Sequence, residues 1–261
     1  VRYPILNYSS YAMHNFRVLT EQRFVRFQNL ELLQHFLPSD LEKCEIGFIL
    51  PHVEIEAEAG PGLVAIPVAQ VAAADQDIEL CAHQLSLMRN ALCDIADTMC
   101  MIPEVCDPDL YFKLLRPWIF GFKDIFFEGI GWFYEMRGES GAMSPSIRSF
   151  EIALGIQYPQ SIADILDEFN DQRTKEERDW LSAIERGPSI KEFVLSHPFE
   201  AKLRKAFNEA SGCLLRVQKA HRGMTMSYIK AKGQGDTATG LTHYESFLDA
   251  VMDATRKNMV W

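Results

Sequence analysis

The chain has 261 residues, of which 48% are hydrophobic and 24% are charged. These proportions are typical of a folded globular protein and exclude an intrinsically disordered chain. Lys and Arg total 26 against 36 Asp and Glu, which gives a net charge of −10. Because an acidic chain without Lys/Arg clusters repels phosphate groups, we expect neither nucleic acid nor an anionic membrane surface among its partners.

The cysteine pattern and the hydropathy of the chain indicate its cellular compartment and whether it associates with a membrane. Six cysteines are scattered along the chain without a CxxC pair, and we expect them to be reduced thiols in a cytoplasmic protein. The most apolar stretch, residues 63–74, is about half the ~20 residues that a membrane helix needs, and it contains Pro67. We therefore expect no membrane partner. The chain starts at Val1 without a methionine, and we expect a further N-terminal segment before it.

Hydrophobic residues recur mainly at the three- and four-residue steps of amphipathic helices. Such stripes predict helices over 77–101 and 207–228, and weaker patterns predict helices over 41–59, 107–122, 145–155, 160–169, 175–186 and 242–258. Gly187-Pro188 is predicted to end one helix, and the next helix is predicted to start just after it. Alternating strand patterns and internal repeats are lacking, so the sequence predicts an all-α fold, with 1–261 as a single helical domain.

Two glycine-containing segments, 128–146 and 232–240, are predicted to be loops of the kind that bind or cover ligands. The second contains GQGDTATG, which is not a phosphate-binding loop, because no strand precedes it and no Gly-Lys-Ser/Thr follows. Ser140 in the first segment lacks the strand–turn–helix setting of a nucleophile elbow.

Two histidines are candidate functional residues. His221 lies in the apolar stripe of 207–228, so its imidazole is expected to point inward. It is either a buried histidine satisfied by a hydrogen bond or an axial ligand of a haem iron. His52 follows Phe48 by one helical turn. It is either a structural histidine or a distal residue that hydrogen-bonds bound oxygen or a substrate N–H.

Arg116 is the candidate for binding a carboxylate. Phe112 and Arg116 are four residues apart and share a helix face, with Tyr111 beside them. This set suits an aromatic amino acid, because rings pack its side chain and a guanidinium binds its carboxylate. The alternative is an Arg that packs its stem over a core aromatic cluster.

Several short motifs follow one another in an order that points to a known family. They are PILNY at 4–8, FILPHVEIEAEAGPGLVAIP at 48–67, LYFKLLRPWIFGF at 110–122, RGESGAMSPSIRSFEIALGIQ at 137–157, ERGPSIKEFVLS at 185–196, and His221–Tyr228 followed by Thr239-Gly240 and Phe247-Leu248. Together they span nearly the whole chain and resemble the large, haem-binding domain of the indoleamine 2,3-dioxygenase family.

This resemblance implies a helical bundle that encloses haem b, with His221 as the proximal iron ligand and Ser140 and Gly141 at the haem edge. It implies that Arg116 binds the substrate carboxylate with help from Thr239, and that His52 acts on the distal side. It also implies a smaller domain before residue 1. The residues expected to enclose an indole ring are Tyr8, Tyr11, Phe48, Tyr111, Phe112 and Ile119.

Three positions depart from the family pattern. His52 stands where a serine or another small residue is usual, and a histidine there would accept the indole N–H and exclude N-substituted indoles. Glu139 replaces a glycine, which places a carboxylate near the haem edge or the substrate ammonium. Gln218 stands where an arginine that supports the haem is common, and Arg216 or Arg222 is the expected substitute.

The function implied is haem-dependent cleavage of the indole C2–C3 bond of L-tryptophan, or of a related indole, by O₂ to give N-formylkynurenine. One alternative is a haem enzyme of specialised metabolism that rearranges or mono-oxygenates tryptophan or a related aromatic amino acid, which His52 and Glu139 favour. Another is a non-catalytic haem or O₂-binding protein. Arg116 and the aromatic set argue against it, because a haem carrier needs no carboxylate site.

Overall fold

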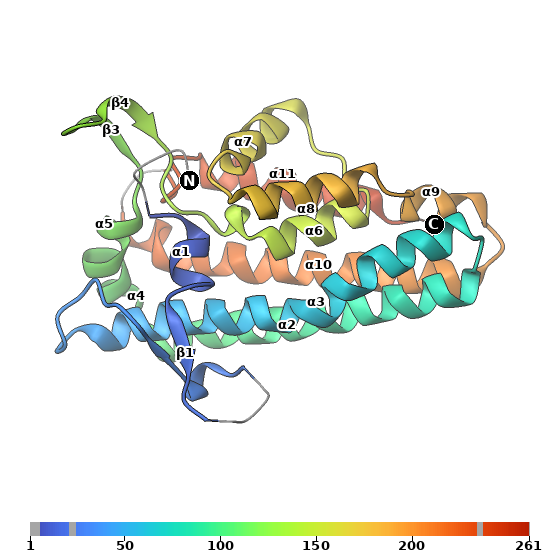
Figure 1. The fold of residues 1–261 in the computed structure, drawn as a ribbon, viewed down its shortest axis with the longest axis horizontal. Helices are drawn as coiled ribbons and strands as arrows, with labels where there is room; N and C mark the ends of the chain where they lie inside the picture. Colours follow the sequence, from blue (N-terminus) through green and yellow to red (C-terminus); the bar gives the residue numbers. More distant parts are fainter. Residues whose placement is uncertain (1–5, 21–24, 234–236, 261) are drawn as a thin grey trace.

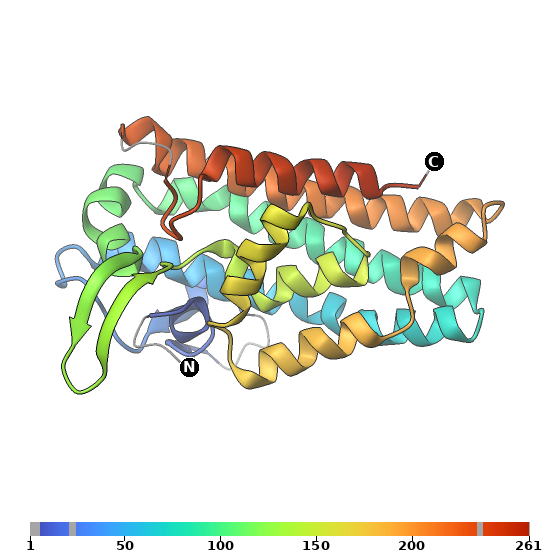
Figure 2. The same ribbon diagram turned by 90° about the horizontal axis from the view of Figure 1, so that it is seen from above.

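The computed structural model describes residues 6–20, 25–233 and 237–260. Within these ranges the chain is mostly helical, so the all-α prediction is confirmed. Three long helices, α2 (Glu42–Ala74), α3 (Ile78–Val105) and α10 (Ala201–Tyr228), lie side by side (Figure 1). The helix α11 (Tyr244–Asn258) runs along α10 (Figure 2). The first two residues of the PILNY motif, Pro4 and Ile5, lie outside the described ranges.

Shorter helices cover one face of this bundle. They are α6 (Pro145–Ala153), α7 (Gln160–Asn170), α8 (Lys175–Arg186) and α9 (Ile190–Ser196), and α6 packs on both α2 and α8. The starts of α6, α8 and α9 carry clear capping signals, since the Ser144, Thr174 and Ser189 side chains each accept a hydrogen bond from a first-turn N–H. The sequence predicted α6, α7 and α8 to within two residues, although α7, which follows Pro159, has no side-chain cap.

Helix α2 extends 15 residues beyond the predicted end at 59, through Pro61 and Pro67. Each proline removes one backbone hydrogen bond, yet tertiary packing overrides that cost because Ala65, Ile66 and Ala69 bury against the bundle. The helix is long and apolar enough to cross a membrane by length and composition. It nevertheless packs along α3, with the Glu45 and Glu54 carboxylates buried in hydrogen bonds to backbone N–H groups, as in the core helix of a globular protein.

The segment predicted as one helix over 107–122 is broken into three turns. These are α4 (Pro108–Leu110), the π-helical turn η2 (Tyr111–Leu115) and α5 (Arg116–Ile119). π-Helical turns are rare and concentrate at functional sites. Here the wider turn carries Tyr111 and leads directly into Arg116.

Two small antiparallel sheets correct the prediction that strands are absent. The hairpin of β3 (Phe122–Phe127) and β4 (Gly131–Met136) projects from one end of the bundle (Figure 1) and occupies part of the loop predicted at 128–146. Gly129 and Gly131 adopt positive φ at its turn. Near the N-terminus, β1 (Phe16–Val18) pairs with β2 (Leu30–Leu32). The remaining short elements are α1 (Tyr8–Ala12) and the 3₁₀ turns η1 (Phe27–Asn29), η3 (Gly141–Met143) and η4 (Lys230–Lys232).

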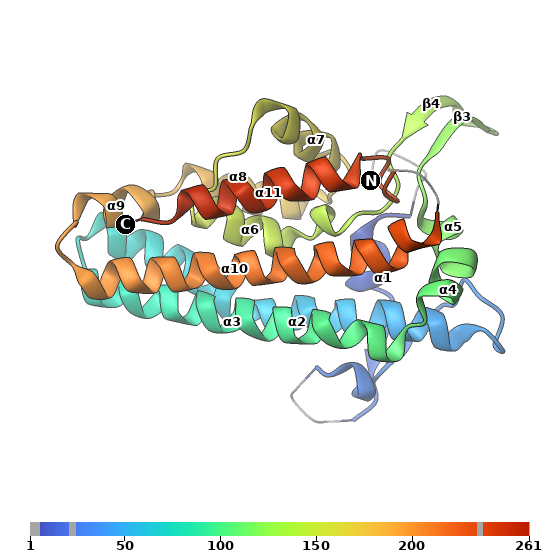
Figure 3. The same cartoon turned by 180° about the vertical axis from the view of Figure 1, so that it is seen from behind.

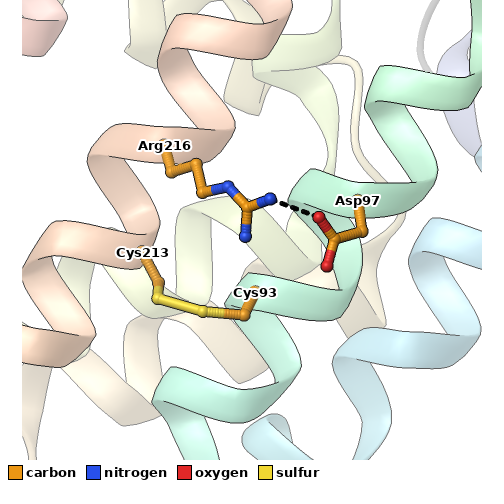
Figure 4. The surroundings of a disulfide bond; sticks show 4 residues. All are labelled: Cys93, Asp97, Cys213 and Arg216. Carbon is orange, nitrogen blue, oxygen red and sulfur yellow. Dashed lines mark hydrogen bonds and ion pairs between the residues drawn. A yellow bond between two sulfur atoms is a disulfide. The ribbon is translucent and has the colours of Figure 1, made fainter.

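A disulfide joins Cys93 on α3 to Cys213 on α10, with 5.4 Å between the Cα atoms. Arg216 forms an ion pair with Asp97 one turn further along the same two helices (Figure 4). The prediction that all six cysteines are reduced thiols was therefore wrong for this pair. The four free cysteines are Cys44, Cys81, Cys100 and Cys106.

A close approach between α2 and the end of α3 fixes the part of α2 that carries Phe48 and His52. A Cβ on Gly47 would lie 2.1 Å from the Val105 carbonyl oxygen, which is a backbone atom that cannot move aside. We therefore expect Gly47→Ala to destabilise the protein by about 1–3 kcal/mol.

Urea unfolding measures this effect, and Gly212→Ala in α10 is the matched control. A Cβ on Gly212 meets no atom within 4 Å, so this change carries only the helix-propensity gain of Ala over Gly, about 1 kcal/mol. Equal unfolding midpoints for the two variants would contradict the close approach.

Candidate functional site

The C-terminal end of α10 approaches α4 and α5 at one end of the bundle (Figure 3). A cavity lies at this end of α10, lined by His221, Met224 and Tyr228 among others. The cavity itself has a volume of about 90 Å³ and opens into a larger space of about 700 Å³ that includes open solvent. Predicted site residues from five separate segments line it, namely Phe48, His52, Tyr111, Ser140, Gly141, His221 and Thr239. The fold therefore brings more than half of the predicted site together.

His221 projects into this cavity from α10, and among the described residues neither of its ring nitrogens has a hydrogen-bond partner. Burial, with a smaller contribution from His52, lowers the pKa of His221 to about 4, so the imidazole is neutral at pH 7. A Cβ on Gly141 would lie 3.3 Å from Nε2, so the absence of a side chain keeps the space at this nitrogen open. A neutral, unpartnered imidazole facing a cavity fits an axial ligand of a haem iron rather than a buried histidine satisfied by a hydrogen bond.

His52 lines the same cavity from α2. Its Nδ1 lies 2.7 Å from the Phe48 carbonyl oxygen. Because a carbonyl only accepts, Nδ1 carries the proton and Nε2 keeps its lone pair. Burial lowers the pKa of His52, which keeps this neutral tautomer at pH 7. His52 therefore offers an acceptor to a ligand in the cavity.

Aromatic rings form the wall between the two histidines. The Phe48 ring lies 4.6 Å from the His52 ring and 4.7 Å from the Tyr111 ring, and Tyr111 packs edge-on against Tyr228 at 5.3 Å. The Tyr228 hydroxyl donates to the Cys106 carbonyl at 2.6 Å, which fixes the ring. This wall suits a flat aromatic ligand.

Arg116 lies beside this cavity rather than in it. Its Nε donates to the Thr239 hydroxyl at 3.3 Å and its Nη2 to the Thr237 carbonyl at 3.1 Å. The guanidinium packs over the Phe112 and Phe120 rings, and with them it lines a second, wider cavity near β3. Thr239 lines the first cavity and contacts Arg116, so it links the guanidinium to the cavity that holds both histidines.

Three of the residues predicted to enclose the indole ring lie behind the cavity lining, namely Tyr8, Tyr11 and Ile119. Tyr8 packs against the Tyr11 ring at 5.6 Å and against the His52 ring at 6.1 Å. Ile119 is buried, and its carbonyl accepts from the Glu139 N–H at 2.8 Å. These residues support the pocket wall, and Phe112 lines the second cavity.

The loop that carries Ser140 and Gly141 is fixed by two buried charged groups. The Glu56 carboxylate accepts hydrogen bonds from the Tyr8, Ser144 and Ser146 hydroxyls at 2.5–2.8 Å, and burial raises its pKa. The Arg173 guanidinium donates to the carbonyls of residues 142 and 143 at 2.7 and 3.2 Å. Burial lowers the pKa of Arg173 to about 10, so it remains a cation at pH 7.

The departures from the family pattern have different outcomes. Glu139 lines the cavity with a buried carboxylate. Arg216 and Arg222 instead form ion pairs with Asp97 and Asp249 at the surface. Neither arginine therefore lines the cavity, so neither replaces the arginine that the family commonly carries at the position of Gln218.

The sequence did not single out the remaining lining residues. Met224 and Tyr228 follow His221 at helical spacing in the same stripe, so that signal was present. Tyr244, Phe247 and Leu248 recur at helical spacing in the helix predicted over 242–258, whereas the lining residues between α10 and α11 had no periodic signal. The lining residues missed as site residues are Met224, Thr225, Tyr228, Ile229, Ala238, Gly240, Thr242, Tyr244, Phe247 and Leu248.

Comparison with known proteins gives one consistent family. The family model described as indoleamine 2,3-dioxygenase matches residues 2–258. The chain is 28% identical to indoleamine 2,3-dioxygenase 1 of Mus musculus, over 98% of this chain and 69% of that protein. It is 26% identical to indoleamine 2,3-dioxygenase 2 of Homo sapiens, over 98% and 68%. A 6-hydroxytryptophan 2,3-dioxygenase of Fusarium equiseti is 25% identical, over 87% and 58%.

The ligand role of His221 can be tested by replacing it. We expect His221→Ala to lose stoichiometric haem binding, because the cavity then offers no unpartnered imidazole on α10. Free imidazole, which fits the space left by the side chain, should restore a haem spectrum. Absorbance titration with haem measures both effects.

His52→Ala is the matched control, because it removes an imidazole from the same cavity and should keep the haem. A full haem complement and an unchanged spectrum in His221→Ala would overturn the assignment. Haem loss in His52→Ala alone would assign the ligand to α2 instead.

Proposed function

Because the chain belongs to the indoleamine 2,3-dioxygenase family, whose members are haem-dependent dioxygenases, we propose that it inserts both atoms of O₂ across the indole C2–C3 bond of L-tryptophan to give N-formylkynurenine. The observation that carries the proposal is a single aromatic-walled cavity that holds two neutral histidines and adjoins Arg116 through Thr239. A relative named for 6-hydroxytryptophan supports the same class of indole amino acid as substrate.

His221 is proposed to hold the haem, which supplies the iron that activates dioxygen when it is bound. The chain's contribution is an imidazole that is already neutral at pH 7 and a loop without a side chain at Gly141. Metal binding then requires no proton release from this imidazole near neutral pH.

His52 and the aromatic wall are proposed to orient the indole. The indole N–H donates to Nε2 of His52, since Nδ1 is already used in the hydrogen bond to Phe48. Phe48 and Tyr111 pack the ring and exclude water. Holding reactants in one orientation in this way can contribute several kcal/mol, on the order of 7–11 in the best cases, to lowering the barrier.

Arg116 is proposed to bind the substrate carboxylate, with the Thr239 hydroxyl as the adjoining donor. Its guanidinium is buried and held between the Phe112 and Phe120 rings, so it is already oriented before substrate binds. The substrate carboxylate would accept the Arg116 hydrogen bond that the Thr239 hydroxyl accepts in the free protein, and it would form a charge-assisted pair with the guanidinium.

The reaction can be tested directly by product mass. Purified, haem-loaded, reduced protein is mixed with L-tryptophan and ¹⁸O₂, and the product is expected to contain two ¹⁸O atoms. Arg116→Gln should lower kcat/KM by at least about tenfold, the size of a lost charge-assisted hydrogen bond, while keeping haem. A product with one ¹⁸O atom would support the mono-oxygenase alternative, and a bound haem without any product would support a carrier.

Substrate range tests the role of His52. With Nε2 as an acceptor for the indole N–H, the protein should discriminate strongly against 1-methyl-L-tryptophan, which has a methyl group where the N–H would donate. His52→Ser should narrow the ratio of kcat/KM between tryptophan and its 1-methyl derivative by about tenfold or more, because the shorter hydroxyl no longer places an acceptor at the position of Nε2 and relieves the steric conflict with the methyl group. An unchanged ratio in the variant would contradict this role.

A further inference from the structure

Glu139 is a buried carboxylate that lines the cavity without a cationic partner. It is 5% exposed, and no Lys, Arg or His in the described part of the chain forms an ion pair with it. Leaving a buried carboxylate charged and unpaired is costly, so the group either takes up a proton or pairs with a cation that a ligand supplies. The nearby Tyr11 hydroxyl has no hydrogen bond of good geometry in the described structure.

The backbone holds Glu139 close to the proposed carboxylate site. Its N–H donates to the Ile119 carbonyl at 2.8 Å, three residues beyond Arg116. The neighbouring Gly138 packs so tightly that a Cβ would lie 2.4 Å from the Thr239 carbonyl oxygen. The segments that carry Arg116, Glu139 and Thr239 are therefore bonded or packed directly against one another.

Tyr111 lies within electrostatic range of both charged groups. Burial raises its pKa, Glu139 raises it further, and Arg116 lowers it. Arg116 and Glu139 nevertheless form no ion pair with each other. A guanidinium and a carboxyl group thus both lie within electrostatic range of Tyr111 without forming an ion pair with each other, which suits the two charges of an α-amino acid.

Burial raises the pKa of Glu139 itself to about 7, and the Tyr11 hydroxyl opposes this rise. A cation placed beside a carboxyl group with such a raised pKa lowers that pKa again, because the cation stabilises the charged form of the carboxyl group.

We propose that Glu139 binds the α-ammonium group of the substrate and, together with Arg116, makes the cavity selective for zwitterionic indole amino acids. This inference rests on the proposed function. A site with both groups distinguishes such substrates from indole acids, which lack the ammonium, and from indole amines, which lack the carboxylate.

Binding to the ferric, haem-loaded protein tests the inference without turnover. Equilibrium dialysis gives the dissociation constants of L-tryptophan, tryptamine and indole-3-propionate. Glu139→Gln should weaken L-tryptophan and tryptamine by at least about tenfold and leave indole-3-propionate within about twofold, because only the first two carry an ammonium.

Two variants serve as controls. Arg116→Gln should show the mirror pattern, weakening L-tryptophan and indole-3-propionate but not tryptamine. Glu135→Gln makes the same charge change on the exposed strand β4 and should alter none of the three. Equal weakening of all three ligands by Glu139→Gln would overturn the inference, as would tighter haem binding in that variant, which would place the carboxylate against the haem propionates instead.

The unaltered protein provides a second measurement if Glu139→Gln fails to fold. It should bind L-tryptophan at least about tenfold more tightly than indole-3-propionate, and equal affinities would overturn the inference. Failure of this inference is distinguishable from failure of the proposed function. Tryptophan oxidation that Glu139→Gln leaves unchanged contradicts only the role of Glu139, whereas a protein that binds none of the three indoles contradicts both.

Discussion

The position of the loop over residues 138–144 against α10 is the constraint on which the cavity depends. The loop has little periodic apolar sequence of its own, and buried polar contacts hold it. Glu56 accepts from the hydroxyls of Ser144 at the end of the loop and Ser146 just after it, and Arg173 donates to the carbonyls of residues 142 and 143 within it. Because each of these groups is buried, removing one would leave its partners without hydrogen bonds, which is more costly than losing an exposed contact. The loop thereby brings Gly141 to the ring of His221 and Glu139 to the cavity wall.

The chemistry of the cavity follows from burial acting differently on each group. Desolvation lowers the pKa values of His52 and His221, so both imidazoles stay neutral and each keeps a lone pair. The same desolvation raises the pKa of Glu139. The protein therefore combines nitrogen ligands and acceptors, which a haem and an indole N–H require, with a carboxylate that gains from a cationic partner.

Much of this arrangement could be predicted from the sequence, and the failures have physical reasons. The stripe of 207–228 identified His221 as an inward-facing residue because helical periodicity is a strong local signal. The end of α2 was misjudged because proline is a local signal that tertiary packing overrides. The β3–β4 hairpin was missed although aromatic runs flank its glycines, and the Cys93–Cys213 bond joins positions 120 residues apart that only the packing of α3 on α10 brings together. Arg116 was expected inside the pocket, but it lies beside the cavity, directly after a π-helical turn that leaves no sequence pattern.

We propose that one cavity holds a haem on His221 and an indole amino acid between His52, Arg116 and Glu139. A crystal structure of the haem-loaded protein with L-tryptophan tests it most directly. We expect iron ligated by His221, the indole N–H at Nε2 of His52, the carboxylate at Arg116 and the ammonium at Glu139. Iron ligated by both His52 and His221, with tryptophan absent or bound in the second cavity, would contradict it.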